Sequence, residues 1–207
     1  MNTTVLHAAG HATGHGAAGP ASQRIVIGYG FWIFLLSDVI LFASLFAAYA
    51  VLIPATAGGP AGRDLFELRT VAIETACLLA SSFMCGMASI AAGERNQLWT
   101  QMALLATGLL GLAFLVLEVR EFRHFVEQGY GPTRSAFLTS FFTLVGCHGA
   151  HVTAGLLWLG TMMAQFWAKG FERHIHYRFM CFALFWHALD IIWVAIFSLV
   201  YLVGVSI

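Results

Sequence analysis

The stretch Gly146-Cys147-His148-Gly149-Ala150-His151-Val152-Thr153-Ala154-Gly155 lies inside a long apolar run, where every ionisable side chain is costly and needs a partner. Its two histidines are three residues apart, so both lie on one side of a helix. Small residues that recur every four positions give another side of this helix a shallow edge, formed by Gly146, Ala150 and Ala154. The stretch therefore predicts a helix on which another helix packs closely.

The composition of the whole chain indicates a membrane protein. Of its 207 residues 59% are hydrophobic and only 10% are charged, with a mean hydropathy of +0.80, whereas a soluble domain is about 25% charged. The formal net charge is zero, so we expect no nucleic-acid partner. The cysteines all fall in apolar runs without disulfide or zinc-finger spacing, which predicts buried thiols: Cys77, Cys85, Cys147 and Cys181.

Five apolar segments are each close to the ~20 residues that cross a bilayer. They predict an all-α, polytopic membrane bundle of five transmembrane helices over residues 28–207, with helices at about 31–53, 71–92, 99–119, 136–165 and 179–203. Residues 1–27 form a predicted disordered, histidine-rich tail that carries His7, His11 and His15. Lysines and arginines are equally numerous on the two predicted sides, so the positive-inside rule does not orient the bundle.

Each predicted helix carries at least one ionisable side chain. A charge at mid-membrane costs roughly 2.5–3.5 kcal/mol on insertion scales, so these groups should face a shared polar interior or a polar contact with another protein. The polar interior that the sequence predicts consists of Asp38, Glu74, Glu118, Glu121, His148, His151, His187 and Asp190.

Three kinds of chemistry fit these residues. The pairs His148/His151 and His187/Asp190 have the i, i+3 spacing of metal sites in helical bundles, and Glu118 with Glu121 would extend them to three helices. Glu118 is expected nearer the membrane edge than the histidines, which counts against that cluster. Interhelical hydrogen bonds worth about 0.6 kcal/mol each are the structural alternative. A proton relay, or axial ligation of haem, also stays open.

Taken together, these motifs resemble subunit III of the haem–copper oxidases. The Gly-x-His-Gly-x-His-Val-x-x-Gly run from Gly146 to Gly155 matches one hallmark of that family, and Trp-His-x-x-Asp-x-x-Trp from Trp186 to Trp193 matches another. Glu118 with Glu121, and the run from Phe31 to Asp38, match two shorter ones. The similarity covers roughly residues 28–204. The five helices, the histidine-rich tail and residues 57–68 are similar to the cytochrome bo-type ubiquinol oxidases of bacteria within this family.

The resemblance implies a non-catalytic subunit III in the bacterial inner membrane, with a cytoplasmic N-terminus and a periplasmic C-terminus. The complex would oxidise ubiquinol, reduce oxygen to water and pump protons. Haem and copper would lie in subunit I, with no catalytic, cofactor-binding or metal-binding residue in this chain. Its partners would be subunit I as the main contact, subunits II and IV, and membrane phospholipid. It would brace subunit I, hold lipid and support proton uptake.

One position departs from the longer members of the family. Alignment on residues 78–82 places Arg69 where those forms carry a buried glutamate, and the nearest acids are Glu67 and Glu74. Two rival interpretations of the residues come from other classes of protein. One is a stand-alone membrane metalloenzyme that uses the histidine pairs as ligands, and the other is a transporter with a path through its own bundle.

Overall fold

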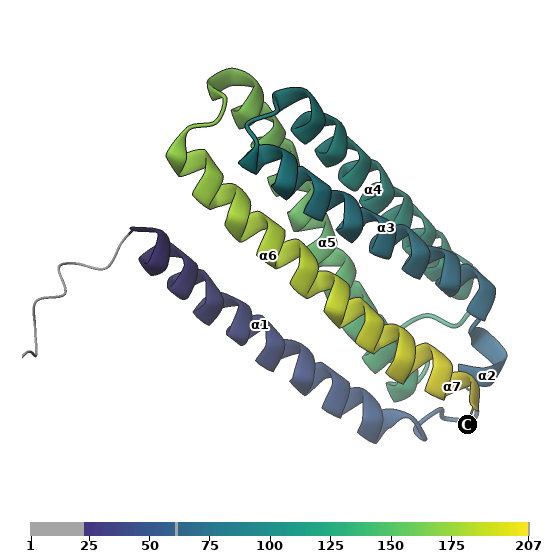
Figure 1. Ribbon diagram of the computed structural model, residues 1–207. Coiled ribbons are helices and arrows are strands. Elements are labelled where there is room, and N and C mark those ends of the chain that lie inside the picture. Colours follow the sequence, from purple (N-terminus) through teal and green to yellow (C-terminus); the bar gives the residue numbers. More distant parts are fainter. Residues whose placement is uncertain (1–22, 61, 207) are drawn as a thin grey trace, which may run out of the picture.

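The chain folds into long helices that run side by side, as the computed structural model of residues 23–60 and 62–206 shows (Figure 1). Five helical spans are long and apolar enough to cross a membrane, which confirms the prediction of a five-helix membrane bundle. The elements are α1 (Gln23–Leu52), α2 (Gly62–Leu65), α3 (Leu68–Gly93), α4 (Gln97–Glu127), α5 (Ala136–Lys169), α6 (Arg173–Ile196), a π-helical turn η1 (Phe197–Leu202) and α7 (Val203–Ser206).

The helices extend beyond the apolar segments. They end at capping residues and turns, and these do not coincide with the edge of the hydrocarbon layer. α4 begins after Asn96, whose side chain accepts a hydrogen bond from the backbone N–H of Trp99 at 3.3 Å. α5 begins after Ser135, which accepts from the N–H of Leu138 at 3.2 Å, and it ends at Gly170 with a φ of 66°. The charged residues after position 119 simply continue α4 to Glu127.

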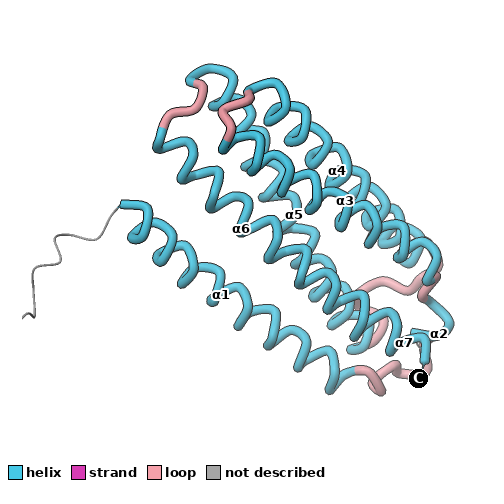
Figure 2. The backbone as a smooth tube through the Cα atoms, viewed as in Figure 1, coloured by secondary structure: helices cyan, strands magenta, loops and turns pink. Residues whose placement is uncertain are grey.

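Helices α3, α4, α5 and α6 pack into an antiparallel bundle, and α1 lies along one side of it against α5 and α6 (Figure 1). Short turns join α3 to α4 and α5 to α6 at one end of the bundle (Figure 2). The most apolar 18-residue window of α1 is only 11% buried, whereas the windows of the other four spans are 33–39% buried. The four-helix bundle therefore contains the core, and α1 presents most of its surface outward.

Two predictions on other parts of the chain have different outcomes. Residues 1–22 of the predicted tail, including His7, His11 and His15, lie outside the described residues, and α1 already begins at Gln23. All four cysteines are free, but only Cys85 and Cys181 are buried. The prediction of buried thiols is thus wrong for Cys77 and Cys147, which are half-buried because they lie at the edges of their helix faces.

Candidate functional site

Trp186 of α6 lies at the centre of the four-helix bundle and joins all of its helices. Its indole Nε1 donates a hydrogen bond to Ser81 Oγ of α3 at 3.0 Å. Its ring lies between two glycines, because a Cβ built on Gly111 of α4 or on Gly155 of α5 would come within 2.9 and 2.8 Å of ring carbons. Gly155, the last residue of the conspicuous stretch in α5, therefore provides the space that this tryptophan occupies.

A second close contact in the same stretch involves Gly149. A Cβ at this position would lie 2.7 Å from Oε1 of Glu118, so the carboxyl group of α4 packs directly on the backbone of α5. The predicted difference in depth between Glu118 and the histidines is wrong. The antiparallel pairing of α4 with α5 places this carboxyl group level with residue 149, between His148 and His151 in the sequence.

Glu118 belongs to a group of three buried or half-buried carboxyls, with Glu74 of α3 and Glu121 of α4, which we call the acidic group. Glu121 Oε2 accepts a hydrogen bond from the hydroxyl of Tyr201 at 3.0 Å. Glu74 is fully buried and neither of its carboxyl oxygens has a hydrogen-bond partner among the described residues, nor has Glu118 Oε2. A buried polar group without a partner costs about 1–3 kcal/mol, so the acidic group does not stabilise the fold by itself.

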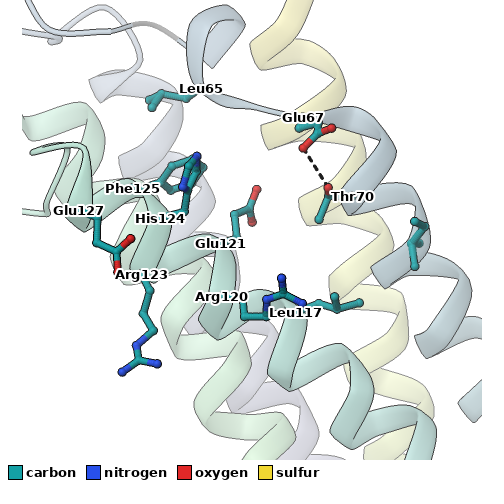
Figure 3. Close-up of a pocket in the computed structure, with 11 residues that line it drawn as sticks. Leu65, Glu67, Thr70, Leu117, Arg120, Glu121, Arg123, His124, Phe125 and Glu127 are labelled. Carbon is teal, nitrogen blue, oxygen red and sulfur yellow. Dashed lines mark hydrogen bonds between the residues drawn. The ribbon is translucent and has the colours of Figure 1, made fainter.

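One end of the bundle has a cavity of about 620 Å³ beside the acidic group, although Glu74 and Glu118 do not line it (Figure 3). Glu121 borders this cavity, and the carboxylate of Glu67 on its far side accepts a hydrogen bond from the Thr70 hydroxyl at 3.2 Å. Arg120 and Arg123 line it as well. Because acids and bases line the cavity together, it shows no preference for a cation or for an anion.

The two histidines of α5 have different surroundings. His148 is fully buried, and neither ring nitrogen has a hydrogen-bond partner among the described residues. Its ring packs instead on Phe42, Phe114 and Trp193, with centroid distances of 6.4, 5.8 and 5.2 Å. His151 is half-buried, lies 2.7 Å from the carbonyl of Cys147 through Nδ1, and lies 3.9 Å from Asp38 Oδ1 through Nε2. His148 is a core residue, and His151 connects the bundle to α1.

His187 and Asp190 lie on the outer side of the α3–α6 contact. The His187 Nδ1 is 2.7 Å from Ser82 Oγ, and both side chains line a groove of about 450 Å³ together with Asp190. One turn further along α6, Trp193 Nε1 donates to Thr75 Oγ1 at 3.0 Å. Serine and threonine hydroxyls of α3 therefore pair with Trp186, His187 and Trp193 of the second family motif, whereas Asp190 Oδ1 is buried without a hydrogen-bond partner among the described residues.

The predicted polar interior is thus divided among four places. Glu74, Glu118 and Glu121 come together, His151 meets Asp38, His187 shares the α3–α6 groove with Asp190, and His148 lies apart among aromatic rings. Among residues 23–60 and 62–206, no three His, Cys, Asp or Glu side chains form a group that could hold a metal ion. The alternative of a three-helix metal cluster is therefore not favoured, because the helix contacts direct its members to different neighbours.

The edge formed by Gly146, Ala150 and Ala154 does not take part in the internal packing of α5. Ala150 and Ala154 are exposed, and a Cβ at Gly146 would make only an ordinary contact of 3.7 Å with Phe122. The close contacts inside the bundle are made by Gly149 and Gly155 on the other side of the helix. Close packing on this edge remains a prediction, and it would involve a helix of another protein chain.

The structure also assigns roles to residues that the sequence reasoning missed. They are the polar partners on the neighbouring helices: Thr75, Ser81, Ser82 and Tyr201. Small hydroxyl side chains on a membrane helix often form interhelical hydrogen bonds, and the Ser81-Ser82 pair was a signal of this kind. Tyr201 gave no such signal, because one tyrosine at the end of an apolar segment fits an interfacial position equally well.

The amino-acid sequence of the chain is similar to those of known proteins. The family model described as cytochrome c oxidase subunit III matches residues 7–205. The chain is 48% identical to cytochrome bo(3) ubiquinol oxidase subunit 3 of Pseudomonas aeruginosa over 99% of both chains, and 48% identical to that of Pseudomonas putida over 85% of both. It is 42% identical to cytochrome c oxidase subunit 3 of Bacillus sp. strain PS3 over 84% of both.

Proposed function

The chain belongs to the cytochrome c oxidase subunit III family, and on that premise we propose that it is the non-catalytic subunit III of a bacterial ubiquinol oxidase complex. Its five apolar spans and its family place it in the inner membrane as a multi-pass protein. In the proposed complex, ubiquinol is oxidised, oxygen is reduced to water and protons are moved across the membrane. The observation that carries the proposal is likeness over nearly the full length to two proteins named as ubiquinol oxidase subunits.

The redox centres of the complex lie outside this chain in our proposal, with haem and copper held by subunit I. The geometry supports this assignment, because the described histidines are spread over separate places and do not form a ligand set. His148 is enclosed by aromatic rings, and His187 bonds to a serine. We assign these side chains structural roles in helix packing, and we assign none of them to ubiquinol.

The role proposed for the chain is to brace subunit I. The exposed side of α1 supports this role, since Leu36, Ile40 and Val51 are 52, 70 and 75% exposed on one apolar helix. The small exposed edge with Ala150 and Ala154 offers a second place where a helix can approach closely. Subunits II and IV and membrane phospholipid are the other partners that we propose. The proposed orientation has a cytoplasmic N-terminus and a periplasmic C-terminus.

Support of proton uptake is a further part of the proposed role. The cavity that Glu121 borders is a polar entry at one end of the bundle, and this end is the periplasmic one in the proposed orientation. Such an entry would serve proton exchange with the periplasm. In our proposal, the chain supports proton uptake from the cytoplasm through the surface by which it contacts subunit I.

Purification of the affinity-tagged chain from its host membrane tests the proposal. The expected result is a co-purified, haem-bearing partner with ubiquinol-dependent oxygen reduction, and a chain that loses both when it is separated from that partner. A haem-free preparation of the isolated chain that reduces oxygen, or stoichiometric iron that is lost in His148→Ala, would overturn the proposal in favour of a stand-alone metalloenzyme.

A further inference from the structure

A basic pocket lies between the α3–α4 turn and the α5–α6 turn, at the end of the bundle where α1 begins (Figure 2). Its volume is about 380 Å³, which falls within the range of about 300–1,000 Å³ that small-molecule pockets have. No acidic side chain of the described residues lines it. The side chains that give the pocket its chemical character are Arg95, Arg173, His176 and Tyr177.

The pocket lies in the polar cap of the bundle and not in its apolar part. Six of the ten residues 169–178 are charged residues or histidines. The apolar run of α6 starts at Phe179, which is about 9 Å further along the helix than Arg173 at 1.5 Å per residue. Trp99 and Trp167, which are 65 and 80% exposed, mark the level of an aromatic belt on the neighbouring helices. A dissolved ligand can therefore reach the pocket from water.

The positive charge of this pocket is not neutralised within the described part of the chain. Neither the Arg95 nor the Arg173 side chain forms a hydrogen bond or an ion pair there. Of the two acids in the adjoining turns, Glu172 lies 3.0 Å from His174, and Glu94 lines a different groove between α3 and α4. A guanidinium group stays charged throughout the physiological pH range, so the pocket presents two positive charges to a ligand.

Contacts between the neighbouring helices hold the two turns in place. Gln97 Nε2 at the start of α4 donates a hydrogen bond to the carbonyl of Phe166 in α5 at 3.2 Å. One turn along α4, Gln101 Nε2 donates to the carbonyl of Met163 at 3.0 Å. The ring of Phe171, which forms a wall of the pocket, packs on Phe166 with a centroid distance of 5.4 Å. The pocket is thus formed before a ligand binds, which lowers the entropic cost of binding.

Arg95 lines the pocket from a backbone conformation that favours glycine. Its φ is 56°, and the turn is closed by hydrogen bonds from its own N–H to Ala92 O at 3.2 Å and from the next N–H to Ala91 O at 3.0 Å. A glycine at this position would relax the turn and remove the positive charge at the same time. The stability of the chain and the binding of an anion should therefore respond in opposite directions, which separates a role of Arg95 in folding from a role in binding.

The ring of Tyr177 gives the pocket an aromatic lining. This side chain is half-buried, and it has neither a hydrogen bond nor a ring contact among the described residues. Aromatic side chains stack on nucleic-acid bases, and one such contact increases the affinity by at least about fivefold. Guanidinium groups bind phosphate with paired N–H donors. Two arginines beside an unpaired aromatic ring therefore match a ligand that carries both phosphate and an aromatic base.

We propose that this pocket binds a soluble nucleoside polyphosphate, whose phosphate oxygens accept hydrogen bonds from Arg95 and Arg173 and whose base stacks on Tyr177. The inference goes beyond the proposed function, because this ligand is neither a redox centre nor a substrate of the oxidase complex. A lipid headgroup shares the phosphate but has no base for Tyr177, and the polar cap places the pocket in water. The experiment therefore compares ligands that have the phosphates, the base or both.

The test measures the binding of ATP to the affinity-purified chain, together with the partners that accompany it, by isothermal titration calorimetry. Arg95→Gln/Arg173→Gln should bind ATP at least about tenfold more weakly, because hydrogen bonds between charged groups are lost. The matched control is Arg178→Gln, because Arg178 is engaged with Gln165 at 3.3 Å and does not line the pocket. Its affinity should equal that of the parent. An undiminished affinity in the double variant, or an equal loss in the control, would overturn the proposal.

Two single substitutions test the parts of the site separately. Arg95→Gly should weaken the binding of ATP about tenfold but leave the unfolding temperature unchanged or raised. Tyr177→Leu should weaken the binding of ATP about fivefold without an effect on tripolyphosphate, and Tyr177→Phe should bind ATP as the parent does.

Three results with the ligands would contradict the proposal. They are adenosine binding as tight as that of ATP, equal losses of ATP and tripolyphosphate in Tyr177→Leu, and displacement of ATP by phosphatidylglycerol. Haem content, measured on the same samples, reports separately on the proposed function, because the pocket lies entirely within this chain.

Discussion

The four-helix bundle and helix α1 have similar hydropathy but different surroundings. The most apolar windows of α1 and α4 both reach a mean hydropathy of 2.2, yet 33% of the α4 window is buried, against 11% of the α1 window. In the bundle, glycines leave space for the ring of Trp186, and serine and threonine hydroxyls accept hydrogen bonds from tryptophan N–H groups. α1 has a polar contact of 3.9 Å from Asp38 to His151 and much apolar surface. The bundle is specified by contacts within the chain, whereas most of the apolar surface of α1 is not covered by the described residues.

Removal of the central indole should give the largest effect. Trp186→Ala leaves a cavity between Gly111 and Gly155 and a serine without its donor, which should destabilise the bundle by about 3–5 kcal/mol. The matched control is Trp32→Ala on α1, where the side chain is 54% exposed and little should change. Thermal unfolding of the purified complex and the amount of chain in membranes measure both. Equal losses for the two tryptophans would remove the contrast between the bundle and α1.

The glycine contacts should give the next largest effect. Gly111→Ala brings a methyl group within 2.9 Å of the Trp186 ring, and overpacking of this kind costs about 1–3 kcal/mol. Gly30→Ala on α1 has no neighbour within 4 Å and should be neutral or slightly stabilising. The same thermal measurement applies. A neutral Gly111→Ala would show that Trp186 moves freely, which contradicts its fixed position.

The hydrogen bond of Tyr201 should give a smaller effect. Tyr201→Phe removes the donor to Glu121 and should cost about 0.6 kcal/mol, which is the average for polar contacts between membrane helices. Glu74→Met tests the opposite case, because Glu74 is buried without a hydrogen-bond partner among the described residues, and an apolar side chain of similar shape should be neutral or stabilising. A loss in Glu74→Met larger than that in Tyr201→Phe would show that Glu74 has a partner outside this chain.

Substitution on the exposed edge of α5 should change the stability of the chain least. Ala150→Leu adds volume at a position of α5 that is exposed in the described part of the chain, so the folding free energy should change by no more than about 0.5 kcal/mol. Assembly with the rest of the complex should fall, whereas Ala150→Ser, which stays small, should assemble normally. Haem content per assembled complex is expected to stay unchanged. Normal assembly of Ala150→Leu would exclude this edge from the contact with a partner.

The sequence was sufficient for the number of helices, because each span is a long apolar run bounded by turn-forming residues. It did not predict where the helices end, since residues such as Arg120 and His124 prolong α4 without being apolar. It placed Gly149 and Gly155 in one motif, but the four-residue period pointed to the outer side of α5, where close packing stays a prediction. The choice between Gly149 and Ala150 depends on Glu118 and Trp186, which lie far away in the sequence.

The candidate site shows the same limit. The i, i+3 spacing correctly paired His187 with Asp190, because two residues one turn apart share a face. That spacing does not reveal which neighbouring helix they meet, and Ser82 of α3 decides that. His148 and His151 have the same spacing but different surroundings. The ring of His148 is enclosed by Phe114 and Trp193, whereas that of His151 lies near Asp38.

The central claim is that the polar side chains of this bundle hold helices together while the redox metals lie in a partner subunit. The most direct measurement is the haem and copper content per assembled complex that carries His148→Leu or His187→Gln. We expect fewer assembled complexes, but the same haem, copper and ubiquinol-dependent oxygen reduction in each one as in the parent. A loss of haem or copper in proportion to the substituted chain would contradict the claim.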